Sequence, residues 1–249
     1  ILGLGVSGPQ VVEGWYGRPF SKPLARTREY ISIIRQVMAR EGAVTNSGPH
    51  YPIPYPTDAP GSWGLGKPLK AITHPFRPNV PIFLGAEGPK NVALASEVCD
   101  GWYPLFYSPF REEVYKDSIA DRPKEFEILC PVNIRVTDDL EAGRLEVKQN
   151  IALYVGGMGS RDRNFHNKLV SRMGFEDAAT RIQDLYLDGK KSDAIAAVPD
   201  ELVDEISLVG PKEVIRQRLA AWEDSAVTGL LVWPKTTKDI ATFAELVLG

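Results

Sequence analysis

Residues 85–90, with the sequence GAEGPK, form a turn that has the residue types to bind an anion. The turn follows the apolar segment VPIFL, and Pro89 suits the first position of a helix, where its missing N–H costs nothing. The free N–H groups and positive end of a helix N-terminus favour phosphate groups, and Lys90 adds a positive charge. Glu87 opposes this interpretation because it brings a negative charge to the same turn. The turn alone therefore predicts either a phosphate site or a corner where glycine permits close packing.

A second glycine turn lies at residues 3–9, with the sequence GLGVSGP. Ser7 offers a hydroxyl group, and the small residues around it leave room for a flat ring. The turn is not a dinucleotide-binding fingerprint, because the spacing after Gly5 is wrong and no matching acidic residue ends the next strand. A structural role remains the alternative for this turn, but two glycine turns after two strands are more informative than one.

Glu13 and His166 are the candidate acid/base residues. Glu13 follows the first apolar segment and could protonate a substrate or cofactor, although a solvated loop carboxylate is the alternative. His166, in the segment RDRNFHNKL, lies in a polar helical region that could cover a site, and a surface or helix-capping role is its alternative. His50, His74 and His166 have no acidic or histidine partner at ligand spacing, so we expect no metal site.

Apolar segments and helical patterns alternate along the chain and indicate how these turns are positioned. Strands are expected at residues 1–6, 80–86, 101–106, 126–137 and 229–233, and helical patterns at residues 23–40, 89–98, 109–120, 138–205, 211–223 and 237–248. Such alternation is typical of a parallel sheet with right-handed crossovers. Five strands are compatible with an open doubly wound sheet or with the last five strands of an eight-stranded barrel.

Residues 42–81 interrupt this alternation. They hold nine of the 20 prolines of the chain and few periodic apolar positions, which indicates a long ordered excursion. Loops of this length in compact domains are usually functional lids or insertions. We therefore expect this segment to be an insertion in the domain.

Composition narrows the class of function. The 249 residues are 43% hydrophobic and 24% charged, as in an ordinary globular protein. A net charge of −3 gives no electrostatic basis for binding nucleic acid or an acidic membrane. Cys99 and Cys130 lie in apolar contexts typical of buried thiols, and no transmembrane or secretory segment is evident. We expect a cytoplasmic protein that acts on a small molecule.

Three blocks of the sequence together resemble a known family. The segments ILGLGVSGPQVVEGWYG, PIFLGAEGPKNVALASEVCDGWYP and LVGPKEVIRQRLAAWEDSAVTGLLV are similar to the luciferase-like monooxygenase superfamily, above all to its branch of actinobacterial oxidoreductases that use coenzyme F420. The resemblance implies an α/β fold of the (β/α)8 TIM-barrel type, seen here from about the fourth strand onward, with the first three strands missing. It also implies one domain over residues 1–249, insertions at about 42–80 and 138–205, and a homodimer.

The resemblance also assigns roles to the two glycine turns. It implies that the cofactor lies across the carboxyl ends of the strands. Its ring system would lie near Gly5, Val6 and Ser7, and its phosphate would be held by Gly85, Ala86, Glu87, Gly88, Pro89 and Lys90.

The chemistry that this arrangement implies is hydride transfer between the deazaflavin ring of coenzyme F420 and an organic substrate. An FMN-dependent monooxygenase is the first alternative. The second is a barrel that has lost its cofactor, in which Glu87 would fill the pocket over the helix start.

Overall fold

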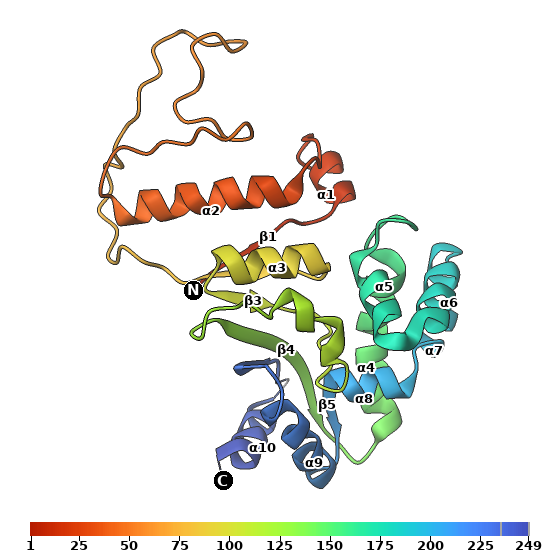
Figure 1. The fold of residues 1–249 in the computed structure, drawn as a ribbon. Helices are drawn as coiled ribbons and strands as arrows, with labels where there is room; N and C mark the ends of the chain where they lie inside the picture. Colours follow the sequence, from red (N-terminus) through yellow and green to blue (C-terminus); the bar gives the residue numbers. More distant parts are fainter. Residues whose placement is uncertain (235, 249) are drawn as a thin grey trace.

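A parallel β-sheet forms the centre of the molecule, with helices along its sides (Figure 1). This computed structural model describes residues 1–234 and 236–248. The strands of the described chain are β1 (Leu2–Gly5), β2 (Ile82–Gly85), β3 (Gly101–Tyr103), β4 (Glu127–Val136), β5 (Ser207–Gly210) and β6 (Gly229–Val232).

All strand pairings are parallel, as the alternation of strands and helices predicted. The strands β1 to β4 pair in chain order, and the long strand β4 pairs with both β5 and β6. Pro131 lies in the part of β4 that pairs with β6, just before the pairing with β5 begins at Asn133. The proline, expected at an edge, bulge or bend, thus lies close to the point where β4 changes its partner.

The helices follow the strands along the chain. They are α1 (Pro9–Gly14), α2 (Pro23–Ala39), α3 (Pro89–Val98), α4 (Leu140–Ala152), α5 (Phe165–Val170), α6 (Glu176–Leu187), α7 (Lys191–Ala196), α8 (Asp200–Ile206), α9 (Lys212–Glu223) and α10 (Thr237–Leu248). Helices α2 and α3 lie along one side of the sheet, whereas α4 to α8 form a separate helical region at one end (Figure 1). The short helix α1 occupies part of the expected glycine-rich loop after the first strand.

Helical structure between residues 138 and 205 is confirmed, and the expected helix at residues 109–120 is wrong. That segment instead holds two single turns of 3₁₀ helix, η1 (Glu112–Val114) and η2 (Lys116–Ser118). Tyr115, between the two turns, is 2% exposed and stacks on Tyr107 with ring centroids 5.2 Å apart. Packing of this tyrosine pair determines the backbone path more strongly than local helix propensity does.

Strand β5 is a further difference from the expected elements. Its four residues follow α8 directly, with no loop between them, and all four are buried. A short apolar run beside a helix has no periodicity of its own, so sequence patterns do not distinguish it from the end of the helix.

Residues 42–81 form a long excursion that extends away from the sheet (Figure 1). Two isolated antiparallel bridges, Val44 to Leu69 and Asn46 to Ile53, are its only β pairings. Glu29 of α2 anchors it, because its carboxylate accepts hydrogen bonds from Asn46 Nδ2 at 3.0 Å and from the Tyr51 backbone N–H at 2.9 Å. The excursion is therefore ordered near α2.

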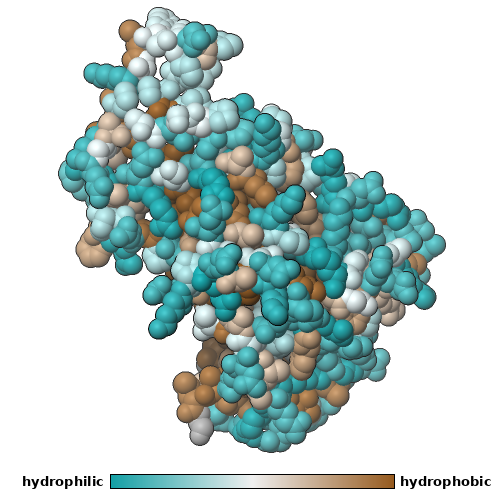
Figure 2. Space-filling view, in the orientation of Figure 1, coloured by the Kyte–Doolittle hydropathy of each residue, from teal (hydrophilic) through white to brown (hydrophobic). Residues whose placement is uncertain are grey.

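The surface in Figure 2 is mainly hydrophilic, with smaller hydrophobic areas between the elements. Within the described residues, no helix is long and apolar enough to cross a membrane. The hydrophobic core runs from the sheet into the helical region, where Ile151, Leu169 and Ile182 are fully buried. The helical region is thus packed onto the sheet through a continuous core.

Candidate functional site

A cavity of about 1030 Å³ opens at the carboxyl ends of the strands. Gly5 ends β1, Gly85 ends β2 and Tyr103 ends β3, and all three residues line the cavity. Parallel strands place these ends at the same edge of the sheet, which is where α/β proteins bind ligands. The cavity is large enough for a cofactor and a small substrate.

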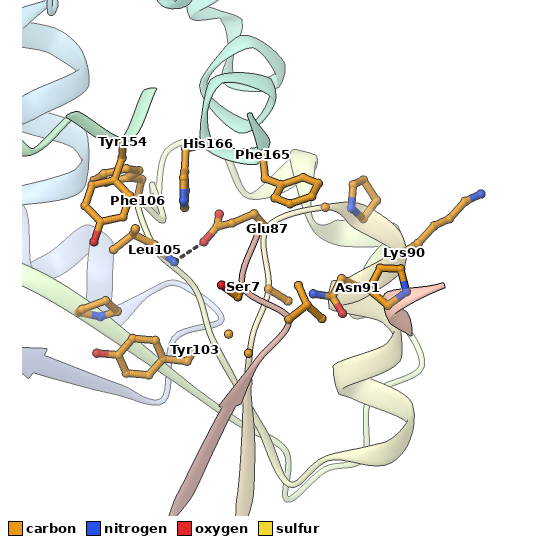
Figure 3. A pocket seen from close by; sticks show the side chains of 18 of the residues that line it. Ser7, Glu87, Lys90, Asn91, Tyr103, Leu105, Phe106, Tyr154, Phe165 and His166 are labelled. Carbon is orange, nitrogen blue, oxygen red and sulfur yellow. Dashed lines mark hydrogen bonds between the residues drawn. The ribbon is translucent and has the colours of Figure 1, made fainter. Parts of the chain in front are cut away.

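Both glycine turns meet in this cavity (Figure 3). All the predicted cofactor-binding residues are among its lining residues: Gly5, Val6, Ser7, Gly85, Ala86, Glu87, Gly88, Pro89 and Lys90. The fold therefore brings together two segments that lie about 80 residues apart in the sequence, as expected where parallel strands are neighbours in a sheet.

The N-terminus of α3 has the features of an anion site. Gly88 is the N-cap residue with extended backbone angles, Pro89 is at the first helical position, and no side chain caps the helix. A Cβ atom added to Gly88 would meet no atom within 4 Å, so the space in front of the helix end is open. Lys90 is exposed beside it. A phosphate group fits this helix end on both steric and electrostatic grounds.

Ser7 has an unusual backbone conformation at the end of β1. Its φ angle is 59°, in the left-handed region that few residues other than glycine adopt. Phe106, after the end of β3, also lines the cavity and also has a φ of 59°. Strained residues of this kind cluster at ligand sites. Two of them on the wall of one cavity support a binding role for that cavity.

Glu87 turns away from the helix end. Its Oε1 accepts a hydrogen bond of 2.9 Å from the backbone N–H of Leu105, as the dashed line in Figure 3 shows. Burial raises the pKa of the Glu87 carboxyl group to about 8. Near neutral pH this side chain is mainly protonated and carries no charge. Glu87 therefore neither fills the space at the α3 N-terminus nor repels an anion there.

His166 lies on α5 and lines the same cavity. Its ring makes edge contacts with the rings of Tyr154 and Phe106, with centroids 4.9 Å and 5.9 Å apart. Burial lowers the pKa of its imidazole to about 4, so the ring is neutral at pH 7. The helix cap is supplied by Asn164, whose side chain accepts a hydrogen bond from the Asn167 backbone. A capping role for His166 is thus excluded, and its place on the cavity wall agrees with the acid/base hypothesis.

Glu13 lies outside the lining of the cavity. It is exposed on α1, and its carboxylate accepts a hydrogen bond of 3.2 Å from the backbone N–H of Phe20, which does line the cavity. The structure therefore brings His166, but not Glu13, together with the two glycine turns. Catalysis by Glu13 stays a prediction.

Several lining residues were not singled out from the sequence as site residues. They are Asn91, Tyr103, Leu105, Phe106, Asn133, Asn150, Tyr154 and Phe165, among others. Leu105 and Phe106 follow β3 after Pro104, so the argument that parallel strands end at one edge would have found them. Tyr154 and Phe165 come from the helical region, and their position depends on packing that periodicity does not specify.

The described residues contain no group of three or more His, Cys, Asp or Glu side chains that could hold a metal ion. Cys99 and Cys130 are buried free thiols. The polar side-chain groups around the cavity are amides, hydroxyls, one carboxyl group, one imidazole, one indole and one lysine. This donor set suits an organic cofactor with an anionic group.

Known proteins share this arrangement of turns and strands. The profile of the luciferase-like monooxygenase family matches residues 1–229. The chain belongs to this family. It is 48% identical over 256 residues to a protein of Mycobacterium tuberculosis that is named as a coenzyme F420-dependent oxidoreductase, an alignment that covers 99% of the chain and 73% of the relative. The resemblance to the F420-dependent branch is thereby confirmed, and the chain is an oxidoreductase.

Solved structures show the same fold. The coenzyme F420-dependent tetrahydromethanopterin reductase from Methanopyrus kandleri superposes with a TM-score of 0.72 at 20% identity, covering 99% of the chain and 72% of that protein. An F420-dependent secondary alcohol dehydrogenase gives a TM-score of 0.63 at 15% identity, covering 99% and 68% respectively. The expected α/β fold of the luciferase-like family is therefore confirmed, with its described strands forming a parallel sheet that is compatible with the barrel.

Proposed function

We propose that the protein transfers a hydride between coenzyme F420 and an organic substrate. One observation carries this proposal: every predicted cofactor-binding residue lines a single cavity of about 1030 Å³ at the carboxyl ends of the strands. The uncapped N-terminus of α3 offers N–H groups to the cofactor phosphate, and Lys90 offers a charge. The deazaflavin supplies the hydride chemistry when bound.

The residues of the chain would orient the cofactor and exclude water. Gly5, Val6 and Ser7 leave a shallow surface for the flat ring, because a Cβ atom added at Gly5 meets nothing within 4 Å. Phe106 and Tyr154 provide apolar walls. His166 can hold or release a proton at the cavity wall, which a carbonyl reduction or an alcohol oxidation requires.

The orientation of Glu87 argues against the hypothesis of a barrel that has lost its cofactor. That hypothesis requires a side chain over the start of α3, and the Glu87 carboxyl group instead bonds to the Leu105 backbone. An FMN-dependent monooxygenase would also use a phosphate site at this position. The distinction between the two cofactors therefore needs a binding measurement.

Titration of the full-length protein with F420 and, separately, with FMN would test the proposal. We expect quenching of F420 fluorescence with saturable binding, and much weaker binding of FMN. Binding of FMN alone, with oxygen uptake when a flavin reductase is added, would establish the monooxygenase alternative. Binding of neither cofactor would contradict both enzyme hypotheses.

We further propose that residues 1–249 belong to one barrel domain of a cytoplasmic homodimer. The continuous core between the sheet and the helical region supports the single domain. Light scattering on the full-length protein tests the dimer, and a monomeric mass would contradict it.

A further inference from the structure

Three buried polar atoms without a hydrogen-bond partner in the described chain belong to residues on the wall of the cofactor cavity, and besides Oδ1 of Asn91 these are two atoms on facing elements. One is Oε2 of Glu87, in the turn between β2 and α3, and the other is Nδ1 of His166, on α5. Figure 3 shows the two side chains pointing toward one another from opposite elements. Buried polar atoms in native proteins nearly always have a partner, so an unpaired acid facing an unpaired imidazole calls for an explanation.

The surrounding contacts hold each side chain by its other atoms. Oε1 of Glu87 is bonded to the Leu105 backbone, and the Glu87 carbonyl oxygen accepts a 2.8 Å hydrogen bond from Arg172 in η4 (Ser171–Phe175). The rings of Tyr154 and Phe106 enclose the His166 imidazole. The turn and the helical region are therefore linked, and Figure 3 shows the two side chains near one another on the cavity wall.

The protonation states of the two side chains are complementary. With a pKa of about 8, Glu87 retains its proton at pH 7 and offers an O–H donor. With a pKa of about 4, His166 is neutral there and has one ring nitrogen free to accept.

Three other ionisable groups lie near Glu87, and one of them, Arg172, acts on its pKa. Arg172 lowers the pKa of its carboxyl group, whereas the nearby Tyr115 and Cys130 have pKa values raised by burial and by Glu87 itself. Tyr115 and Cys130 are therefore neutral near pH 7 and leave the Glu87 proton in place.

We propose that Glu87 is a positioning residue: its carboxyl O–H donates a hydrogen bond to Nδ1 of His166 and so fixes the neutral imidazole tautomer that presents Nε2–H to an uncharged carbonyl oxygen in the cavity. The inference rests on the proposed function. Neither atom has another hydrogen-bond partner in the structure, and a hydrogen bond between them would satisfy both. When Nδ1 accepts a proton donor, the hydrogen of a neutral imidazole must be on Nε2.

This tautomer suits the reduction of a carbonyl group. The carbonyl carbon accepts a hydride from the reduced deazaflavin, the π electron pair of the C=O bond moves to oxygen, and that oxygen takes the proton of Nε2. Nδ1 takes the carboxyl proton of Glu87, which leaves a neutral imidazole and a carboxylate that solvent reprotonates. His166 would be the catalytic acid, and Glu87 would act through it.

The lining of the cavity near the pair narrows the substrate class. Leu105, Phe106, Tyr154 and Phe165 present mostly apolar surface there, and both members of the pair are uncharged near neutral pH. A carboxylate or phosphate at this position would be desolvated against uncharged and mostly apolar side chains, which is costly. The site therefore favours an apolar aldehyde or ketone.

The tautomer can be measured by ¹⁵N NMR of the full-length protein with labelled histidine, without cofactor. In the wild type at pH 6.5 we expect His166 to carry its hydrogen on Nε2, and above pH 8 to move it to Nδ1, because the Glu87 carboxylate then accepts. Glu87→Gln keeps a donor at the same position, so the Nε2–H form should persist to pH 9. Glu87→Leu should give a mixture of tautomers.

Glu125→Gln, at an exposed glutamate outside the cavity lining, is the matched control and should behave as the wild type. A His166 tautomer that does not respond to pH in the wild type, or that titrates equally in Glu87→Gln, would overturn the inference. Because this measurement needs no cofactor, its failure is distinguishable from failure of F420 binding.

Steady-state kinetics with F420 and cyclohexanone, an uncharged ketone, give the second readout. The wild-type kcat/KM for ketone reduction should fall about tenfold per pH unit above pH 8, whereas Glu87→Gln, which has no carboxyl proton to transfer to Nδ1, should have a lower kcat/KM without this alkaline limb. Cyclohexanecarboxylate, a charged molecule of similar size, should not compete with the ketone. Competition by this anion, or an alkaline limb that persists in the Gln variant, would contradict the role of the pair.

Discussion

At the scale of single residues, Glu87 shows how burial changes the charge that a residue type predicts. In the sequence it is an acid in a turn that should bind an anion. In the structure its carboxyl group bonds to the Leu105 backbone, and burial raises its pKa to about 8. The residue type predicted repulsion of a phosphate, whereas desolvation removes most of that charge near neutral pH.

The raised pKa of Glu87 predicts a pH-dependent stability. The folded chain keeps a proton that the unfolded chain releases above its ordinary pKa of 4.5, so the free energy of unfolding falls as the pH rises from 4.5 to about 8. The slope is about 1.4 kcal/mol per pH unit for one group. Glu87→Gln removes this contribution, and in urea unfolding its stability relative to the wild type should increase between pH 5 and pH 8.

The lowered pKa of His166 makes the free energy of unfolding rise with pH between about 4 and its ordinary pKa of 6.5. The wild type and Glu87→Gln both contain His166, so this contribution cancels when their stabilities are compared. Glu125→Gln should show a difference from the wild type that does not grow in this pH window. A constant difference for Glu87→Gln as well would mean that Glu87 is already ionised at neutral pH.

At the scale of elements, Arg111 fastens the helical region to the segment that follows β3. Its guanidinium bonds to Glu205 at 2.8 Å and to Glu201 at 2.9 Å, both on α8, and lies over the ring of Phe175 at 5.1 Å. Ser108 Oγ donates a 2.8 Å hydrogen bond to the same Glu205. Since α5 belongs to this helical region, these contacts help to position His166.

Arg111→Met should destabilise the protein by about 3 kcal/mol, because it leaves the Glu205 carboxylate buried without its cation. The Glu205 side chain is only 10% exposed. Adding Glu205→Gln to this variant should recover a large part of the loss. Arg28→Met removes a pair with Glu97 in which both side chains are about half exposed, and should destabilise the protein far less. Equal losses for the two arginine variants, measured by urea unfolding, would show that Arg111 has no anchoring role.

Some helices and strands were predictable from the sequence and others were not. The strands that carry Gly5 and Gly85, and the helix that begins at Pro89, were predictable because buried apolar runs and glycine turns are local signals. Strand β5 and the 3₁₀ turns around Tyr115 were not, because strand pairing and tyrosine stacking depend on contacts distant in sequence. The cofactor turns were predictable because they are local signals in the sequence. The arrangement of Glu87 opposite His166 was not, because it depends on the packing of α5.

At the scale of the whole molecule, the parallel sheet places the turns that follow its strands side by side in one site. The ends of β1, β2 and β3 lie at the same edge, and the helical region covers that edge with His166 and Phe165. A ligand bound there would contact both parts of the molecule. Cofactor binding should therefore stabilise the folded state as a unit, and the effect is measurable as a shift in the melting temperature Tm.

Gly88→Asp should weaken cofactor binding without destabilising the folded protein. The position has N-cap geometry with a φ of −78°, and an added Cβ meets no atom within 4 Å, so Asp fits and caps α3 at least as well as glycine does. Its carboxylate would take the N–H groups that we assign to the cofactor phosphate and would repel that phosphate. We expect an unchanged or slightly higher Tm without cofactor, and F420 binding about 100-fold weaker, equivalent to ~2.7 kcal/mol.

Thermal melts with and without F420 give the readout. At about 100 times the Kd the wild type should gain about 2.7 kcal/mol, or roughly 5–10 °C in Tm, while Gly88→Asp should gain little at the same concentration. Gly42→Asp is the control, because Gly42 lies in the excursion, outside the cavity lining, and has equally open space around its Cβ position. It should bind F420 as the wild type does. A Gly88→Asp variant that keeps the full thermal shift would place the cofactor phosphate away from α3, since no anion could share that helix end with a carboxylate at similar affinity.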